Sequence, residues 1–499
     1  MTNNPPIAFD NTYIRLPERF YARERPTAVA GPALIHSNPL LAGQLGIDPD
    51  WLSSDDALQV FAGNRVPPGA EPIATVYAGH QFGGWNPRLG DGRAILLGEV
   101  VDAGNRRHDI QLKGAGQTPY SRMGDGRAPL GPVLREYIVS EAMAALGVAT
   151  TRSLAAVTTG EPVYRDRALP GAILTRVARS HIRVGHFQYF LAKDDTEALQ
   201  LLADHLIERD FPIARQADNP YLALLEQAVA RQAQLIAQWQ LVGFIHGVMN
   251  TDNMLVCGET IDYGPCAFMD SYDPQACYSS IDQGKRYAYR NQPVIAQWNL
   301  SWLAQSLLPV LIAAEGPGVD DKQVIGRAQA ILDDFSRQYE TAYSLGLHRK
   351  LGIGVPSEAS AQLAEALLAQ MTTQQLDFTL TFRRLADLAD PQGDQMGSVN
   401  YPLPPSLDPL IEAWRELHDG DGYSPAERQR SMYAANPAYI PRNHRVEQAI
   451  QAAEQDGDFG PFHRLVERLG RPFDYDPDDQ DLAVPPLPHQ AVRQTFCGT

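Results

Sequence analysis

The stretch between residues 246 and 264 combines a His-Gly turn with closely spaced carboxylate and amide side chains. It begins with His246 and Gly247, continues to Asp252 and Asn253, and ends with a D-Y-G sequence that starts at Asp262. Oxygen ligands of this kind are the ones that hard divalent cations prefer. Asn and Asp are also common turn formers, but two such groups flanking one loop indicate a metal site built from Asn253 and Asp262. A chain that forms this site has to fold both segments around one cavity.

The spacing matches the kinase catalytic loop, H-x-D-x-x-x-x-N followed by D-F-G. The metal-binding Asn of that pattern corresponds to Asn253, whereas the catalytic Asp is replaced by Val248. Asp252 lies directly before Asn253 and is a candidate general base, a role that contributes about 10²–10⁴-fold to a rate. The alternative is that Asp252 caps a turn. The pattern predicts a kinase-like metal site without the usual kinase base.

A Lys and a Glu stand where kinases keep their phosphate-contacting ion pair. Alternating apolar residues predict a β-hairpin from strands 93–101 and 109–113, followed by a helix over 132–146. Lys113 ends the second strand and Glu136 lies early in the helix. In kinases this pair holds the ammonium group at the phosphates. We expect the same here, although an exposed pair of this kind would contribute little.

The pentapeptide G-D-G-R-A occurs twice, at Gly90 and at Gly124, on either side of Lys113. Glycines let backbone amides approach a phosphate, and each arginine offers a planar fork for its oxygens. Simple turns are the alternative. Arg176 and Arg183 add more positive charge than a kinase nucleotide site needs. The surplus indicates a polyphosphate that lies deep against the strand-rich part, or a nucleotide that points the other way round.

Composition excludes several classes of function. The net charge of −17 over 499 residues argues against a general nucleic-acid binder, though it leaves room for a local basic pocket. The apolar run 307–314 is much shorter than the roughly 20 residues of a membrane span. The N-terminus lacks the pattern of a signal peptide, and four cysteines do not indicate a disulfide scaffold. We expect a cytoplasmic protein with no nucleic-acid or membrane partner.

Strand patterns dominate the first part of the chain and helix patterns the second, which predicts an α+β, two-lobed, kinase-like fold. Further strands are expected at 153–158 and 172–177, and helices at 221–241, 299–313 and 361–370. Residues 1–75 are expected to be irregular, and the Pro- and Asp-rich tail from 471 to be an extended arm. The expected units are an N-terminal extension (1–75), an N-lobe (76–200), a C-lobe with the metal site (201–430) and a C-terminal extension (431–499).

Longer motifs point to one family. These are Y-A-G-H-Q-F-G from residue 77, L-G-D-G-R, Q-L-K-G-A-G-Q-T-P-Y-S-R, G-D-G-R-A, H-G-V-M-N-T-D-N and D-Y-G-P. Together they resemble the selenoprotein O (SelO) family of the bacterial YdiU type, which are protein adenylyltransferases with a pseudokinase fold. The resemblance implies that ATP binds inverted in a kinase-like cleft. AMP then passes to Ser, Thr or Tyr hydroxyls of proteins, with the chain itself a candidate substrate, and pyrophosphate leaves.

The resemblance also implies residue roles, although the nine-residue gap from Asn253 to Asp262 is shorter than in typical kinases. ATP would be the co-substrate and Mg²⁺ or Mn²⁺ the cofactor. In the implied assignment the phosphates are held by Lys113, Arg176 and Arg183, and Glu136 anchors Lys113. The metal is bound by Asn253 and Asp262, and Asp252 accepts the proton. The nucleotide site is completed by Gly90, Gly92, Arg93, Asp125, Gly126 and Asp262.

Other readings stay open. UMP transfer from UTP with Mn²⁺ is a variant of the main one, and an ordinary phosphotransferase could use Asp252 as its base. A nucleotide-binding scaffold without activity would explain Val248 but not the retained Lys, Glu, Asn and Asp. Cys497, where many animal members of the family carry selenocysteine, could form a disulfide with Cys266 or Cys277 and act as a redox switch with Cys277.

Overall fold

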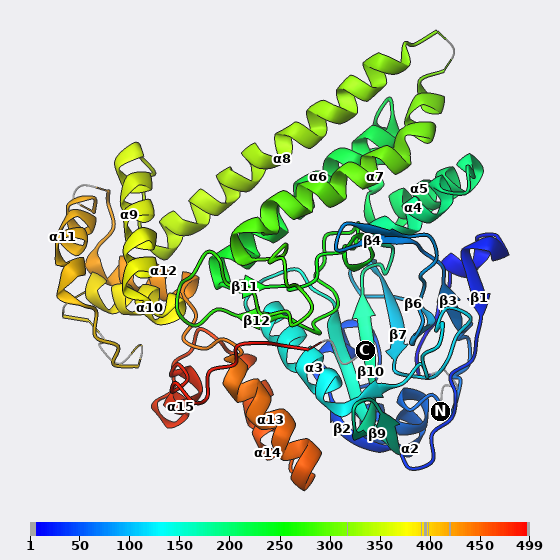
Figure 1. Cartoon of the computed structure of the whole chain (residues 1–499), viewed down its shortest axis with the longest axis horizontal. Helices are drawn as coiled ribbons and strands as arrows, with labels where there is room; N and C mark the ends of the chain where they lie inside the picture. Colours follow the sequence, from blue (N-terminus) through cyan, green and yellow to red (C-terminus); the bar gives the residue numbers. More distant parts are fainter. Residues whose placement is uncertain are drawn as a thin grey trace.

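The computed structural model describes residues 6–316, 318–390, 392–393, 397, 399–418 and 421–496. An antiparallel sheet from the first part of the chain lies beside long helices from the second part, which is the expected two-lobed α+β architecture (Figure 1). The main sheet has the spatial order β1 (Tyr21–Arg23), β3 (Ile73–Thr75), β6 (Ala94–Val101), β7 (Arg107–Lys113), β10 (Ala168–Ala178), β9 (Arg152–Tyr164) and β2 (Ala33–Ser37), with β8 (Ala128–Pro129) paired to β10.

The expected hairpin is β6 and β7, which pair antiparallel with Ala94 opposite Lys113. Side chains alternate between the two faces of a strand, and this alternation separates the core from the site. Ile110 and Leu112 face the core formed with α1 (Pro39–Gln44) and α2 (Asp55–Phe61). Gln111 and Lys113 therefore point to the opposite face, where α3 (Leu130–Ala145) packs.

The first 75 residues are not irregular, which corrects the expectation for this segment. They supply β1, β2 and β3 to the main sheet, and β1 and β2 form its two edges. β2 pairs with β9 through Leu34 and Val157, residues far apart in the chain. The boundary at residue 75 remains a proposal. β9 also extends through Gly160 to Tyr164, beyond the expected strand end.

Helix α3 is fixed on both sides. One side packs on β9 and β10, and the other packs on α13 (Asn443–Asp456) and α14 (Gly460–Leu469). The Tyr137 ring lies 5.7 Å from that of Phe462, and Arg135 forms an ion pair with Glu447. The helix ends before Gly147, whose positive φ of 79° stops it as expected. The C-terminal extension is thus a support for α3.

The second lobe is built around α6 (Pro220–Val242), the expected long helix. The Asn219 side chain caps its first turn by accepting from Leu222 N, and Gly243 ends it in the left-handed conformation. α8, the 30-residue helix beside α6, was not anticipated because its sequence is largely polar. The remaining helices are α4 (Val184–Leu191), α5 (Thr196–Asp210), α7 (Gln292–Glu315), α8 (Asp321–Lys350), α9 (Glu358–Gln374), α10 (Phe378–Ala389), α11 (Asp408–Glu416), α12 (Pro425–Ala435) and α15 (Gln480–Ala483).

Two short strand pairs hold the region between the lobes. These are β4 (Gly79–Gln81) with β5 (Gly84–Asn86), and β11 (Phe244–Ile245) with β12 (Ala267–Phe268). The tail is less extended than expected, because it contains α15 (Gln480–Ala483) and because Thr495 packs against the segment that follows Asp262. Thr495 donates to the carbonyls of Tyr278 (2.8 Å) and Pro265 (2.6 Å). Among the described helices, none combines the length and apolarity that a membrane crossing requires.

Candidate active site

A cavity of about 970 Å³ lies between the sheet and the loop that follows β11. It collects the residues that the sequence singled out, from segments spread over more than 170 positions. Glu136 does not line the cavity but contacts two residues that do. The expected residues in its lining are Gly90, Gly92, Arg93, Lys113, Asp125, Gly126, Arg176, Arg183, Asp252, Asn253 and Asp262.

Two cations and two carboxylates form one buried network at the cavity floor. Lys113 Nζ donates to Glu136 Oε2 (2.5 Å) and to Asp262 Oδ1 (3.0 Å). Arg176, opposite Gln111 in the β7–β10 register, donates to Glu136 Oε1 (2.8 Å from Nε) and to Asp262 Oδ1 (2.8 Å from Nη2). The expected Lys113–Glu136 pair therefore forms, and Arg176 completes it into a closed square.

The network explains the charge state of its acids. Burial alone would raise the pKa of Asp262, but Lys113, Arg176 and Arg183 outweigh burial and hold it well below its usual value. Burial opposes ionisation of Glu136 too, and Arg176 and Lys113 again lower its pKa. Both carboxylates are thus ionised at neutral pH.

The loop after β11 is held from behind by His246. Its ring is fully buried, stacks on Trp239, and its Nε2 lies 2.8 Å from the carbonyl oxygen of Ile261, the residue before Asp262. Asn253 Nδ2 donates to the carbonyl of Val248 (3.0 Å), which leaves the amide oxygen of Asn253 for other partners. The His therefore connects the two segments that carry the candidate metal ligands.

Asp252 has one carboxylate oxygen engaged and one without a partner among the described residues. Gln81, on β4, donates to Oδ2 at 3.0 Å, while Oδ1 is buried and unpaired. Burial raises the pKa of Asp252 to about 6, although Gln81 and Arg183 oppose this shift. A buried acceptor without a donor is costly, so this oxygen suits a proton acceptor or a cation ligand. It is not the turn cap of the alternative reading.

Arg183 lies deep in the cavity and is oriented by groups that the sequence did not single out. Asp91, between the two glycines of the first G-D-G-R-A, accepts from Arg183 Nη1 at 3.1 Å. The guanidinium also lies 4.5 Å over the ring of Tyr77. The Y-A-G-H-Q-F-G motif supplies Tyr77, and also the Gln81 that donates to Asp252, and was the available signal for these two side chains.

The glycines of both G-D-G-R-A copies are required by close packing of the protein itself. A Cβ at Gly90 would meet Tyr120 Cγ at 2.5 Å, and one at Gly126 would meet the Gly116 carbonyl oxygen at 2.0 Å. Asp125 accepts from Arg165 at 2.8 Å, at the exposed rim. Residues of both copies thus line the cavity.

The side chains that line the cavity carry a net positive charge, although the chain as a whole is negative. Its lining has seven Lys and Arg side chains against four Asp carboxylates, whereas the whole chain carries −17. This is the local basic pocket that composition allowed. It suits a polyphosphate, since guanidinium groups bind phosphate oxygens with two parallel hydrogen bonds.

The donor set fits a hard divalent cation. The amide oxygen of Asn253 and the carboxylate of Asp262 are oxygen donors that line one cavity. No cluster of three or more His, Cys, Asp or Glu with metal-binding geometry occurs in the described ranges. Mg²⁺ bound through one or two carboxylates and substrate phosphates does not need such a cluster.

Of the two cysteines in the expected redox pair, only Cys277 lies within the described residues. Cys277 is half-buried, and its thiol lies 3.3 Å from Asp282 Oδ2. Burial is the larger cause and the nearby Asp282 carboxylate the smaller one, and together they raise the pKa of the Cys277 thiol to about 11. Little thiolate therefore exists at neutral pH. Cys497 lies outside the described residues. Thr495, two positions before it, forms a parallel bridge with Ser279.

Comparisons with known proteins identify the family of this chain. A family model described as "Protein adenylyltransferase SelO" matches residues 6–470. A protein nucleotidyltransferase YdiU from Rhodopseudomonas palustris (strain BisB5) is 57% identical over 494 residues, covering 98% of this chain and 99% of that protein. The YdiU of Rhizobium rhizogenes (strain K84) is 53% identical over 496 residues, covering 99% and 97%. The chain therefore belongs to the SelO family and is a protein nucleotidyltransferase.

Proposed function

We propose that the chain transfers AMP from ATP to hydroxyl side chains of proteins, with ATP bound so that its triphosphate points into the cavity. The observation that carries this proposal is the depth of the positive charge. Lys113, Arg176 and Arg183 are all buried, at 8%, 2% and 3% exposure. A triphosphate drawn toward them has its γ-phosphate innermost, shielded from an approaching protein. The α-phosphorus then faces the opening.

In the proposed reaction the hydroxyl oxygen of the substrate bonds to the α-phosphorus. The bond from that phosphorus to the oxygen bridging to the β-phosphate breaks, and pyrophosphate leaves with the electron pair. The hydroxyl proton passes to Asp252, whose Oδ1 is free to accept it. Val248, at the position of the kinase base, has an aliphatic side chain that cannot take this role.

The fixed charges stabilise the leaving group. Lys113 and Arg176 are already oriented by Glu136 and Asp262, so little reorganisation is needed as negative charge develops on pyrophosphate. Asn253 and Asp262 would hold a divalent cation, which neutralises phosphate charge when bound. The reaction thus depends mainly on positioning and charge, with Asp252 assisting the nucleophile.

The basic cavity suits ATP or UTP equally, so AMP is preferred over UMP through the family alone. Mg²⁺ and Mn²⁺ both suit the oxygen donors. The composition supports a cytoplasmic location, and protein substrates follow from the family. Ordinary γ-phosphoryl transfer is disfavoured by Val248 and by the buried arginines.

The test is a set of parallel incubations with α-labelled ATP, γ-labelled ATP and α-labelled UTP, each with Mg²⁺ and with Mn²⁺. The acceptors are the chain itself and an added protein, and Asp262→Ala is run beside the unaltered chain. We expect label on protein from the α position only, and none with Asp262→Ala. Label from γ would show a kinase, and full activity of Asp262→Ala would refute the metal assignment. A stronger signal from UTP would change the nucleotide but not the mechanism.

A further inference from the structure

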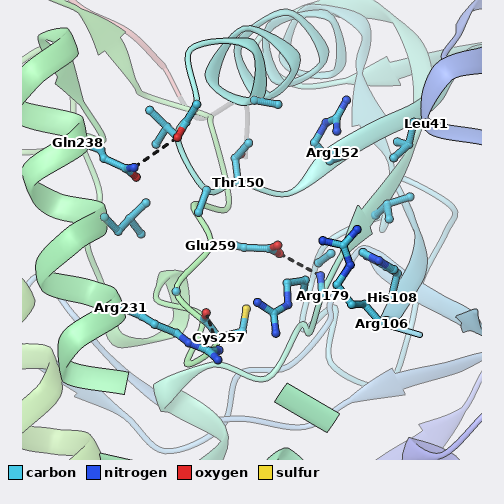
Figure 2. Close-up of a pocket in the computed structure, with 18 of the residues that line it drawn as sticks. Leu41, Arg106, His108, Thr150, Arg152, Arg179, Arg231, Gln238, Cys257 and Glu259 are labelled. Carbon is cyan, nitrogen blue, oxygen red and sulfur yellow. Dashed lines mark hydrogen bonds between the residues drawn. The ribbon is translucent and has the colours of Figure 1, made fainter. Parts of the chain in front are cut away.

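A second cavity, of about 760 Å³, lies between the lobes on the side of α6. Figure 2 shows its lining, with Arg231 and Gln238 on α6, Arg179 after β10, and Cys257 and Glu259 on the turn before Asp262. Its volume lies within the range of small-molecule sites, roughly 300–1,000 Å³. Nothing in the nucleotidyl-transfer mechanism uses it.

Two guanidinium groups in this cavity are incompletely paired: Arg179 has one long contact with Asp210, at 3.5 Å, and Arg231 has no carboxylate partner among the described residues. Arg231 donates to the carbonyl oxygens of Asp210 (2.7 Å) and Cys257 (3.3 Å), and forms no ion pair with a described carboxylate. Burial and the nearby charge of Arg179 lower its pKa. Arg179 Nε is buried without a hydrogen-bond partner among the described residues. Two like charges held together in this way favour an anion between them.

The carboxylates nearby compensate these two guanidinium groups only in part. Asp210 Oδ1 lies 3.5 Å from Arg179 Nη2, while its other oxygen, Oδ2, lies 3.2 Å from Arg209 Nε. Glu259 accepts from the backbone N–H of Arg179 at 2.9 Å and forms no ion pair with a described side chain.

The other charged residues of the cavity are already paired. Arg106 and His108 both contact Asp102, and Arg152 is held by Glu141.

We propose that this cavity is an effector site for a small organic anion, of about the size of a mononucleotide, whose phosphate or carboxylate group binds between Arg179 and Arg231. Arg179 is a third exposed, at 33%, so the ligand can enter from solvent. Gln234 and Gln238 offer hydrogen bonds for its uncharged part. Burial raises the pKa of Glu259 to about 7, so its protonated form can donate to the anion as well.

The site is joined to the catalytic cavity by two short segments. Arg176 and Arg183 line the catalytic cavity, and Arg179 between them lines the second one. Glu259 is three residues before Asp262, and Thr260 between them is bonded to Ala149 of the second cavity (3.0 Å). A ligand that moves either segment therefore acts on the phosphate-binding groups, and coupling between the two ligands is reciprocal.

The test is calorimetric titration of AMP, and separately of citrate, into the full chain saturated with Mg²⁺ and a non-hydrolysable ATP analogue. Saturation with the analogue blocks the catalytic cavity. If the Kd of the probe stays constant when the concentration of the analogue is raised severalfold, the probe does not compete for that cavity. Arg179→Gln is the principal variant because the side chain is partly exposed. Arg231→Lys is the second, and exposed Arg430→Gln is the matched control.

We expect one saturable site whose Kd rises about 10- to 100-fold in Arg179→Gln and is unchanged in Arg430→Gln. Binding of AMP alone assigns a phosphate ligand, and binding of citrate alone a carboxylate. No saturable binding of either probe, or binding by Arg179→Gln and Arg231→Lys that is as tight as binding by the unaltered chain, would overturn the site. An unchanged Kd of the ATP analogue with and without the probe would overturn the coupling. None of these results depends on transfer activity.

Discussion

Replacing Glu136 by Gln tests the closed network at the cavity floor. Glu136 is 2% exposed and accepts from Lys113 and Arg176 at 2.5–2.8 Å. Gln keeps the shape of the side chain, so no cavity is created. Its neutral amide can accept from one cation only, and its NH₂ group then faces the other. Two buried cations would be left with the single charge of Asp262.

The expected loss follows from that imbalance. Removing one partner from a buried ion pair destabilises a protein by about 3–5 kcal/mol, and urea unfolding should show a loss of this size. Lys113 and Arg176 also lose the group that orients them toward the phosphates. We expect ATP binding to weaken and AMP transfer to fall by about 10²-fold or more, as when one preorganised charge is removed.

Glu141→Gln is the matched control on the same helix. Glu141 accepts from Asn38, Arg152 and Ser153, so its replacement should also destabilise the fold. None of these partners belongs to the network at the cavity floor, so transfer should stay nearly unaffected. If Glu136→Gln unfolds at the same urea concentration as the unaltered chain, or if both variants lower transfer to the same extent, the argument from the buried network is wrong.

Three further predictions follow from single side chains. Asp252→Asn should lower kcat by about 10²–10⁴-fold while calorimetry shows unchanged nucleotide binding; undiminished turnover would remove Asp252 as the base. Burial lowers the pKa of Lys350 to about 7 from 10.5, so between these values the unfolded chain binds a proton that the folded chain lacks, and stability rises with pH. Urea unfolding at about pH 7.5 and 9.5 should show this rise flattened in Lys350→Met but not in exposed Lys322→Met; three equal slopes would contradict it. Gly126→Ala should destabilise more than Gly457→Ala, because both have φ +68° but only Gly126 meets a carbonyl oxygen, at 2.0 Å; equal unfolding curves would rule out the clash.

The parts of the fold that the sequence predicted are those encoded locally. The β6–β7 hairpin follows from alternating residues, and α6 from its apolar stripe between Asn219 and Gly243. The strands of the first 75 residues were missed because their partners are distant, as with Leu34 and Val157. Short strands with little alternation of their own become strands only when the sheet is there to pair with them.

The candidate site divides in the same way. Asn253, Asp262 and Lys113 were found through spacing that reports on local loops. The contacts of Asp91 with Arg183, 92 residues apart, and of Gln81 with Asp252, 171 apart, were not found. An Asp between two glycines carries no sign of the arginine that it will meet. Such pairs are products of tertiary folding.

The double packing of α3 bears on how this enzyme can be switched. In protein kinases the corresponding helix swings to make or break its Lys–Glu pair, and that motion is a common means of control. Here Tyr137 is locked against Phe462, and Arg135 against Glu447, on the side to which the helix would have to move. An outward swing would first require α13 and α14 to detach. The C-terminal helices therefore hold α3 in the position that forms the Lys113–Glu136 pair, and a swing of this helix would cost the contacts of Tyr137 and Arg135 together with that pair.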